Sequence, residues 1–401
     1  MKRFRSRQMV VTIQGTSIKK VVTLAVLGWM MMFTVVGVMT SLKPEYRITS
    51  SSVNSVTNHF PEETFIHLFS FENHYFLQSL PKERQNISYS SILLRMITSI
   101  NPDDPRSLLG SELPGFALYD SKIVVAGEGT DYTNMPYESA PPLEVMLAER
   151  EASIENLEKA DQDQDKQPVP PPTKTTGGRK VVYIYSTHTY ESYLPALKGA
   201  NDPDQAFHRT VNVTKVGQKL QEELEKRGIG AVESTVDVQQ KLSEKGMDYA
   251  QSYDMSRQVV MQAMGQNRDL QYLIDIHRDA QRRKFTTATI NGVSYARVAF
   301  IVGGENANYE KNLQLATQLH QLLQKKYPGL SRGVIEKKGR GTNGKFNQDL
   351  SNNALLIEFG GVDNTFDELF RSAAAVADVF SEHYWQAEKV QAPASDPPQK
   401  Q

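Results

Sequence analysis

The chain has 401 residues, of which 39% are hydrophobic and 23% charged, and its formal net charge at pH 7 is -1. This length exceeds that of one ordinary domain, the composition is typical of a globular protein, and the charge balance does not favour nucleic acid as a partner. The sequence contains no cysteine. This excludes disulfides, cysteine nucleophiles and cysteine-ligated zinc, so any metal must be bound by His, Asp or Glu.

The first segments indicate a membrane anchor. Residues 1–20 carry six basic residues and no acidic one, and residues 21–42 carry no charge. A helix needs about 20 apolar residues to cross a bilayer, and the positive-inside rule places the basic tail in the cytoplasm. A cleaved signal peptide is the alternative, but the apolar run exceeds the usual length of about 7–15 residues and no clear A-x-A site follows. We expect an uncleaved single-pass anchor, with everything after residue 43 outside the cytoplasm.

The next segments read as a small extracytoplasmic region, 43–140, and a linker, 141–180. The first contains one predicted strand at 122–129 and no recognisable chemistry. The second ends in a charged run, clustered prolines and a glycine pair, which cannot build a core. We place the main boundary near 180, the catalytic domain at 181–387 and a disordered tail at 388–401.

Residues 181–387 alternate between strand and helix patterns. Strands are predicted at 181–186, 229–234, 270–277 and 352–361, a hairpin around Asn291-Gly292, and helices at 211–228, 249–266, 308–329 and 366–386. Such alternation predicts an α/β fold with a mostly parallel sheet flanked by helices on both faces.

Polar side chains end three of the predicted buried strands. His188 follows the first, His277 ends the second, and Glu358 interrupts the third. Each alone could be an ordinary hydrogen-bonded surface or strand-end residue. If the strands are parallel, however, all three side chains lie at one edge of the sheet, where the sites of α/β proteins gather.

The spacing of His188 and Glu191 predicts a metal site. Residues three apart in a tight turn can hold one ion, and His277 would complete a set of two histidines and one glutamate, the arrangement of catalytic zinc. A separate carboxylate must then transfer the proton, and Glu358 is the candidate. His208, just before the first helix, is the rival third ligand; we favour Glu191. Glu191 as a helix-capping carboxylate remains the structural alternative.

Three further charged residues have candidate roles near these histidines. Arg278 could neutralise a substrate carboxylate or a developing oxyanion, or form a structural pair with Asp279 or Glu358. Asp275 and Asp279 could orient a histidine.

Residues 339–346 fit the spacing of a P-loop, but Phe346 stands where Ser or Thr is needed, and 335–338 make a poor buried strand. We interpret this segment as a substrate loop, with Arg340, Asn343 and Asn347 available for polar contacts.

Four stretches, YSTHTYESY (185–193), NVTKVGQKLQEELEKRGI (212–229), IDIHRDA (274–280) and NNALLIEFGGVDNTFDE (352–368), together resemble the stage II sporulation protein P family of endospore-forming bacteria. The domain is similar, more distantly, to zinc-dependent N-acetylmuramoyl-L-alanine amidases, and His188, His277 and Glu358 match their two histidine ligands and catalytic glutamate. The acidic ligand departs from that pattern, because its position at the first helix is occupied by His208.

The resemblance implies a zinc-dependent peptidoglycan hydrolase that cuts the amide between muramic acid and L-alanine, and also peptide crosslinks. It implies work at the engulfing septal membrane with stage II sporulation proteins D and M. A metallocarboxypeptidase acting on stem peptides and a non-catalytic wall-binding scaffold remain the alternatives.

Overall fold

The computed structural model describes residues 20, 23, 26–33, 66, 69–70, 72–79, 121–139, 150–152, 172–339 and 342–391. The chain divides into two units, 1–108 and 109–401. Described parts of the first unit include a helical segment at 26–33 and a short 3-10 helix, η2 (His74–Ser79).

The expected membrane anchor falls mostly outside the described residues. Of residues 21–42, only 23 and 26–33 are described, and they are helical. Among the described residues, no helix has the length and apolar character needed to cross a membrane. The anchor therefore stays a prediction.

The second unit is built on a seven-stranded sheet with the order β1-β8-β7-β9-β4-β2-β3. The strands are β1 (Lys122–Ala126), β2 (Val182–Tyr185), β3 (Ala231–Glu233), β4 (Tyr272–Asp279), β7 (Val298–Gly303), β8 (Ser331–Lys337) and β9 (Ala354–Gly361). The pairs β2–β3, β2–β4, β4–β9 and β7–β8 are parallel, whereas β1–β8 and β7–β9 are antiparallel. The predicted mostly parallel α/β sheet is confirmed, and so is the shared direction of the three strands that carry the polar ends.

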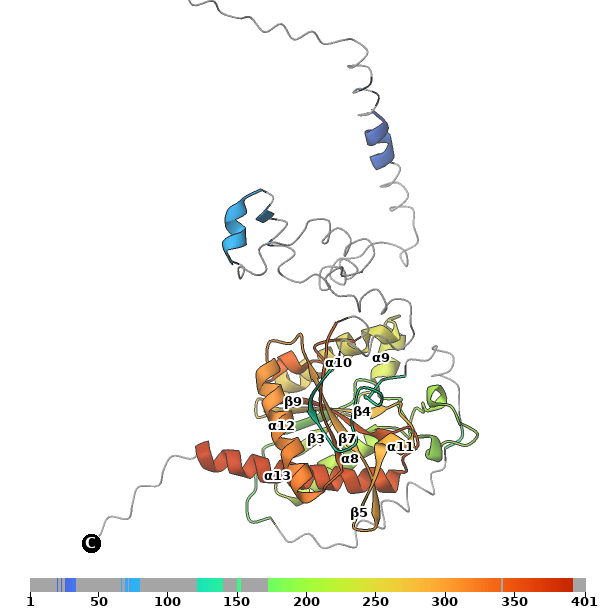
Figure 1. Ribbon diagram of the computed structural model, residues 1–401, viewed down its shortest axis with the longest axis vertical. Coiled ribbons are helices and arrows are strands. Elements are labelled where there is room, and N and C mark those ends of the chain that lie inside the picture. Colours follow the sequence, from blue (N-terminus) through green and yellow to red (C-terminus); the bar gives the residue numbers. More distant parts are fainter. Residues whose placement is uncertain are drawn as a thin grey trace, which may run out of the picture. The chain divides into compact units, whose positions relative to one another are not determined.

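Helices cover both faces of this sheet (Figure 1). On one face, α8 (Thr214–Lys226), α12 (Tyr309–Lys326) and α13 (Phe366–Gln391) bury their apolar stripes against alternate strand residues such as Ile274 and Ile276. On the other face, α10 (Ser252–Gln266) packs through Val260 against Leu273 and lies beside α9 (Val238–Glu244). β4 thus sends even-numbered apolar residues to one face and odd-numbered residues to the other.

Turn chemistry sets two of the connections. Gly228 ends the turn after α8 with φ of 80°, and a Cβ there would lie 2.0 Å from the Lys174 carbonyl oxygen. Asn291 and Gly292 adopt φ of 52° and 80° between β5 (Thr287–Ile290) and β6 (Val293–Ala296), as the predicted two-residue hairpin requires. This hairpin follows a short helix, α11 (Arg283–Thr286), and forms a separate two-stranded sheet.

Two strands of the sheet differ from the sequence expectation. Residues 335–338 were expected to make a poor buried strand, yet β8 is buried along its whole length. Its polar side chains are paired, since Arg332 forms an ion pair with Asp279 and Glu336 accepts a hydrogen bond from Tyr309 at 2.6 Å. β1 was assigned to the region before the linker, but it pairs with β8 and joins the same unit as residues 181–387.

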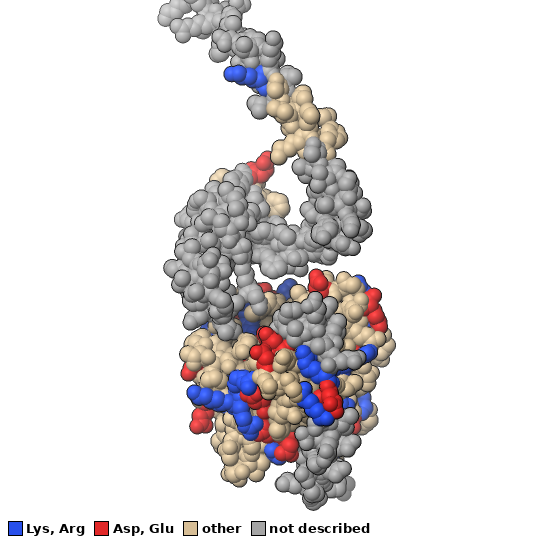
Figure 2. Space-filling model, turned by 90° about the vertical axis from the view of Figure 1, so that its right-hand side faces the viewer, with Lys and Arg blue, Asp and Glu red and all other residues tan. Residues whose placement is uncertain are grey.

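At the other end, α13 continues to Gln391, four residues past the expected end of the domain at 387, and the rest of the expected tail lies outside the described residues. On the face drawn in Figure 2, the described basic and acidic side chains are interspersed, with neither sign gathered into one patch.

Candidate metal centre

The site lies at the carboxyl ends of β2, β4 and β9, on the face covered by α10. His188 stands in the loop after β2, and His277 lies on β4 directly beside Glu358 of β9. Paired residues of neighbouring strands point to the same face, so the last two side chains share the face of Leu273 and Leu356. The alternation that buries β4 therefore also aims its polar residues into the site.

The two histidines face each other edge to face, with ring centroids 5.2 Å apart. Tyr249 stacks on His188 with a centroid distance of 4.5 Å, and Tyr253 meets the same ring edge-on at 5.5 Å. Both tyrosines come from the start of the α10 region. These rings form apolar walls that leave the histidines 3% and 0% exposed.

Asp275 fixes both histidine-bearing segments. Its Oδ1 and Oδ2 accept hydrogen bonds from the Thr187 amide at 2.9 Å and the Thr187 hydroxyl at 2.6 Å, which anchors the loop of His188. The same Oδ1 lies 3.2 Å from His277 Nε2, within ion-pair distance but outside hydrogen-bond geometry. A carboxylate behind one ring nitrogen leaves the other, Nδ1, to face the site, as is usual for metal-binding histidines.

Glu191 also lies in the site. It is fully buried, its Oε2 accepts a hydrogen bond from the Arg278 amide at 3.1 Å, and the same oxygen lies 3.7 Å from His277 Nδ1. Glu191 thus approaches His277 from the tight turn that begins at His188, whose carbonyl accepts a hydrogen bond from the Glu191 amide at 3.1 Å.

His208 has partners at both ring nitrogens. Nδ1 accepts from the amides of Thr210 at 3.1 Å and Val211 at 2.9 Å, and Nε2 lies 3.0 Å from the Arg150 carbonyl oxygen. The ring closes the turn that leads into α8. Between the two rival ligands, the contacts favour Glu191.

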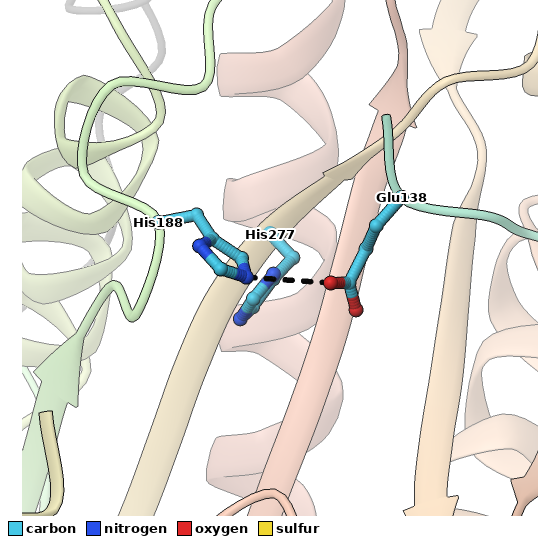
Figure 3. A group of neighbouring side chains, drawn as sticks. All are labelled: Glu138, His188 and His277. Atoms are coloured by element: carbon cyan, nitrogen blue, oxygen red, sulfur yellow. Dashed lines mark ion pairs between the residues drawn. The ribbon is translucent and has the colours of Figure 1, made fainter. Parts of the chain in front are cut away.

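One residue of the site was not predicted from the sequence. Glu138, in the segment after β1, places Oε2 3.3 Å from His188 Nε2. Among the described residues, Glu138, His188 and His277 form a group whose potential ligand atoms all lie within 4.8 Å of one another. Figure 3 shows their side chains converging from three separate segments. No local pattern marked Glu138, because its neighbours form neither a helix nor a strand.

Several buried polar atoms in the site form no hydrogen bond with any described residue. They are His188 Nδ1, Glu191 Oε1, both ring nitrogens of His277 and both carboxylate oxygens of Glu358. A buried polar atom without a partner is costly, and a cluster of them calls for an ion or ordered water. The donor set of imidazoles and carboxylates fits a divalent cation such as Zn²⁺.

The charge balance points the same way. Four carboxylates, those of Glu191, Asp275 and Glu358, which are buried, and of the partly exposed Glu138, lie near two buried imidazoles. Burial disfavours the charged form of His277, but Asp275, Glu191 and Glu138 outweigh it and raise the pKa of His277 to about 10. Burial would likewise raise the pKa of Glu138, but His188 lowers it below its ordinary value. Such an excess of negative charge suits a cation.

Burial, opposed by the nearby charges of Lys337 and His277, raises the pKa of Glu358 to about 8. Unlike the other carboxylates, Glu358 has no hydrogen bond within the described residues that would hold it ionised. It can therefore exchange a proton near neutral pH.

In the structure, Arg278 and Asp279 both contact segments that flank the site. The Arg278 guanidinium lies over the Phe207 ring at 5.4 Å and donates to the Ala206 carbonyl at 3.2 Å. Asp279 pairs with Arg332 and accepts from the Tyr137 amide at 3.1 Å. Both residues hold neighbouring segments in place.

The expected substrate loop is only partly described, since Arg340 lies outside the described residues. Asn343 accepts a hydrogen bond from the Phe346 amide at 2.6 Å, and buried Asn347 donates to Ser256 at 2.9 Å. Phe346 packs edge-on against Tyr253 at 5.4 Å. The described end of the loop thus braces one wall of the site.

The fold and these residues define an α/β protein with a buried histidine–carboxylate candidate metal centre. The chain belongs to the stage II sporulation protein P family, because the sequence model of that family matches residues 103–381. It is 52% identical over 392 residues to the stage II sporulation protein P of Bacillus subtilis (strain 168), and the match covers 98% of each chain. The family expected from the sequence is confirmed.

Two solved structures show weaker similarity. One is an N-acetylmuramoyl-L-alanine amidase from Clostridium difficile 630, with 15% identity and a TM-score of 0.33, covering 54% of this chain and 100% of that one. The other is a metallo-carboxypeptidase from Burkholderia cenocepacia, with 11% identity and a TM-score of 0.31, covering 54% and 60%.

Proposed function

We propose that this protein is a membrane-anchored, zinc-dependent peptidoglycan hydrolase that acts on the septal wall during sporulation. Its reaction is cleavage of the amide between muramic acid and L-alanine, together with cleavage of peptide crosslinks. The observation that carries the proposal is a buried cluster of ring nitrogens and carboxylate oxygens, on His188, His277, Glu191 and Glu358, that form no hydrogen bond within the described residues.

In this proposal His188, Glu191 and His277 hold the zinc ion. Zinc in such a site polarises a carbonyl and lowers the pKa of a water molecule. Asp275 orients both histidines, through Thr187 in one case and by direct contact at 3.2 Å in the other. Arg278 acts as a positioning residue, because its amide holds Glu191 and its side chain is engaged by Ala206 and Phe207.

Glu358 is the proposed general base and acid. Its buried carboxylate takes the proton of the attacking water and returns it to the leaving amine nitrogen. A pKa near 8 suits both steps at neutral pH, and a neighbouring cation would favour the ionised form needed for the first. The position beside His277 on the next strand places the carboxylate next to the metal ligands.

The cellular setting is also part of the proposal. The uncharged run at 21–42 after a basic tail supports a single-pass anchor that holds the domain against the wall outside the cytoplasm. The family and the named sporulation relative support a role in sporulation. We propose the septum and engulfing membrane as its place, as the sequence resemblance implies. Stage II sporulation proteins D and M are the proposed partners.

Mass spectrometry of purified peptidoglycan digested by the full chain, with and without added Zn²⁺, tests the reaction. Released intact stem peptides are expected, together with loss of crosslinks, and both should require the metal. Shortened stems still attached to glycan would instead identify a carboxypeptidase. His188→Ala and His277→Ala should abolish release, whereas His74→Ala, a change at an exposed histidine of the first unit, should not. Full release by either site variant would overturn the proposal.

A further inference from the structure

Glu138 belongs to a segment, residues 134–139, that we call the strap. It follows β1 and lies along the carboxyl end of β4, where Ala280 donates to the Tyr137 carbonyl at 2.9 Å. Asp279 accepts from the Tyr137 amide at 3.1 Å, and Gln281 donates to the Met135 carbonyl at 3.2 Å. Met135 is 1% exposed. The strap backbone is therefore fixed independently of the Glu138 side chain.

The contact that Glu138 makes has the spacing of two ligands of one ion. Two atoms that each lie about 2.0–2.1 Å from a tetrahedral zinc ion are about 3.3–3.4 Å apart. Glu138 Oε2 and His188 Nε2 are 3.3 Å apart, and the potential ligand atoms of Glu138, His188 and His277 all lie within 4.8 Å of one another. Among the described residues, the second oxygen, Oε1, accepts a single hydrogen bond, a long one of 3.4 Å from the Tyr253 hydroxyl.

Including Glu138 raises the number of protein ligands that the metal site would have from three to four. Glu191, which we propose as a ligand beside the two histidines, places Oε2 3.7 Å from His277 Nδ1, so Glu138 would be a fourth protein ligand. Four protein ligands are typical of structural zinc, whereas catalytic zinc has three and keeps one position open. A hydrolase with all four in place has no position for water or for the amide carbonyl.

The four groups differ in their access to solvent. The side chain of Glu138 is 24% exposed, whereas those of His188, Glu191 and His277 are 4%, 0% and 0% exposed. Glu138 can turn outward about its own side-chain bonds without breaking the backbone contacts of the strap. The three buried groups have no comparable path.

We propose that Glu138 is a displaceable fourth ligand: it closes the metal site in the resting protein and swings out to admit water and the wall amide. The inference rests on the proposed function and adds a restraint on it. The strap thus provides an on-site block to hydrolysis, released when substrate or a partner draws the carboxylate away.

Cobalt binding tests this proposal without depending on wall hydrolysis. The full chain, its Glu138→Gln variant and the control Glu128→Gln are loaded with Co²⁺, whose visible spectrum reports the ligands. Glu128 is an exposed glutamate of the loop between β1 and the strap, so its change is chemically matched. Glu138→Gln should alter the spectrum and weaken Co²⁺ and Zn²⁺ binding by at least about tenfold. Loss of a residue that only contacts a metal ligand already weakens metal binding by about 10–100-fold, so loss of a ligand should cost at least the lower value.

Activity then separates a displaceable ligand from a permanent one. At saturating Zn²⁺, Glu138→Gln should release wall fragments several-fold faster than the wild type, while Glu128→Gln matches it. Glu138→Asp keeps the negative charge, but its shorter side chain cannot reach the ion, so it should behave like Glu138→Gln. Agreement between the two variants would exclude a folding defect in one of them as the cause. Circular dichroism checks that both remain folded.

Two results would overturn the proposal. An unchanged cobalt spectrum and affinity in both folded variants would show that Glu138 is not a ligand. A weakened site whose wall release is also lost at saturating Zn²⁺ would show a permanent ligand. If the wild type binds Co²⁺ through Glu138 and neither it nor the folded Glu138 variants cleave peptidoglycan, the proposed hydrolysis fails while the ligand assignment stands.

Discussion

The Asp275→Asn substitution probes the residue that fixes both histidine-bearing segments. Asp275 accepts two hydrogen bonds from Thr187, at 2.9 and 2.6 Å, and faces His277 Nε2 at 3.2 Å. Asparagine keeps the shape but has one acceptor oxygen instead of two and carries no charge. One charge-assisted hydrogen bond is lost, and the negative charge behind the His277 ring disappears.

The expected cost follows from these contacts. Loss of one hydrogen bond to a charged group should lower the free energy of unfolding of the metal-free protein by about 1.5–3 kcal/mol. Loss of the carboxylate behind the histidine should weaken zinc binding by about 10–100-fold, equivalent to about 1.4–2.7 kcal/mol. The zinc-loaded protein should therefore lose more stability than the metal-free one.

Urea unfolding of the full chain with and without saturating Zn²⁺ measures the first quantity, and competition with a chromophoric chelator measures the second. Asp269→Asn, at an exposed position shortly before β4, is the matched control and should change neither. An Asp275→Asn protein that binds zinc within twofold of the wild type would refute the assignment of Asp275 as the residue that orients His277.

Three further predictions address the catalytic carboxylate, the third ligand and acid stability. Glu358→Gln should lower wall release by about 10²–10⁴-fold while elemental analysis finds the same zinc content; retained activity would remove Glu358 from the mechanism. Glu191→Gln should weaken zinc binding, whereas His208→Ala should leave it unchanged and instead lower the melting temperature, because two amides lose their acceptor; the reverse pattern would make His208 the ligand. Burial would raise the pKa of Glu368, but bonds from Arg283, Ser294 and Asn364 lower it to about 2. Its stabilisation is thus complete above pH 4.5, the ordinary value, and is lost as pH falls toward 2. Acid unfolding of Glu368→Gln should lack this part of the pH dependence, and an acid profile identical to that of the wild type would contradict the assignment.

Much of the site could be predicted from local patterns. His188, His277 and Glu358 each interrupt or follow a run of residues that is apolar enough to be a buried strand. A polar residue placed there needs a partner or a function, and parallel strands bring their carboxyl ends to one edge. The observed order β9-β4-β2, all parallel, brings the three residues together as expected.

The sequence by itself determined the α/β class, the hairpin at Asn291-Gly292 and the strand ends that meet, because these depend on side-chain periodicity and turn chemistry within short segments. Only the tertiary structure decided that β8 is a buried strand, since its polar side chains find partners such as Asp279 in distant segments. It also favoured Glu191 over His208, whose ring nitrogens are occupied by nearby backbone groups, and brought Glu138 to His188 through the pairing of β1 with β8. Local patterns report whether a side chain is buried, but not which remote segment packs against it.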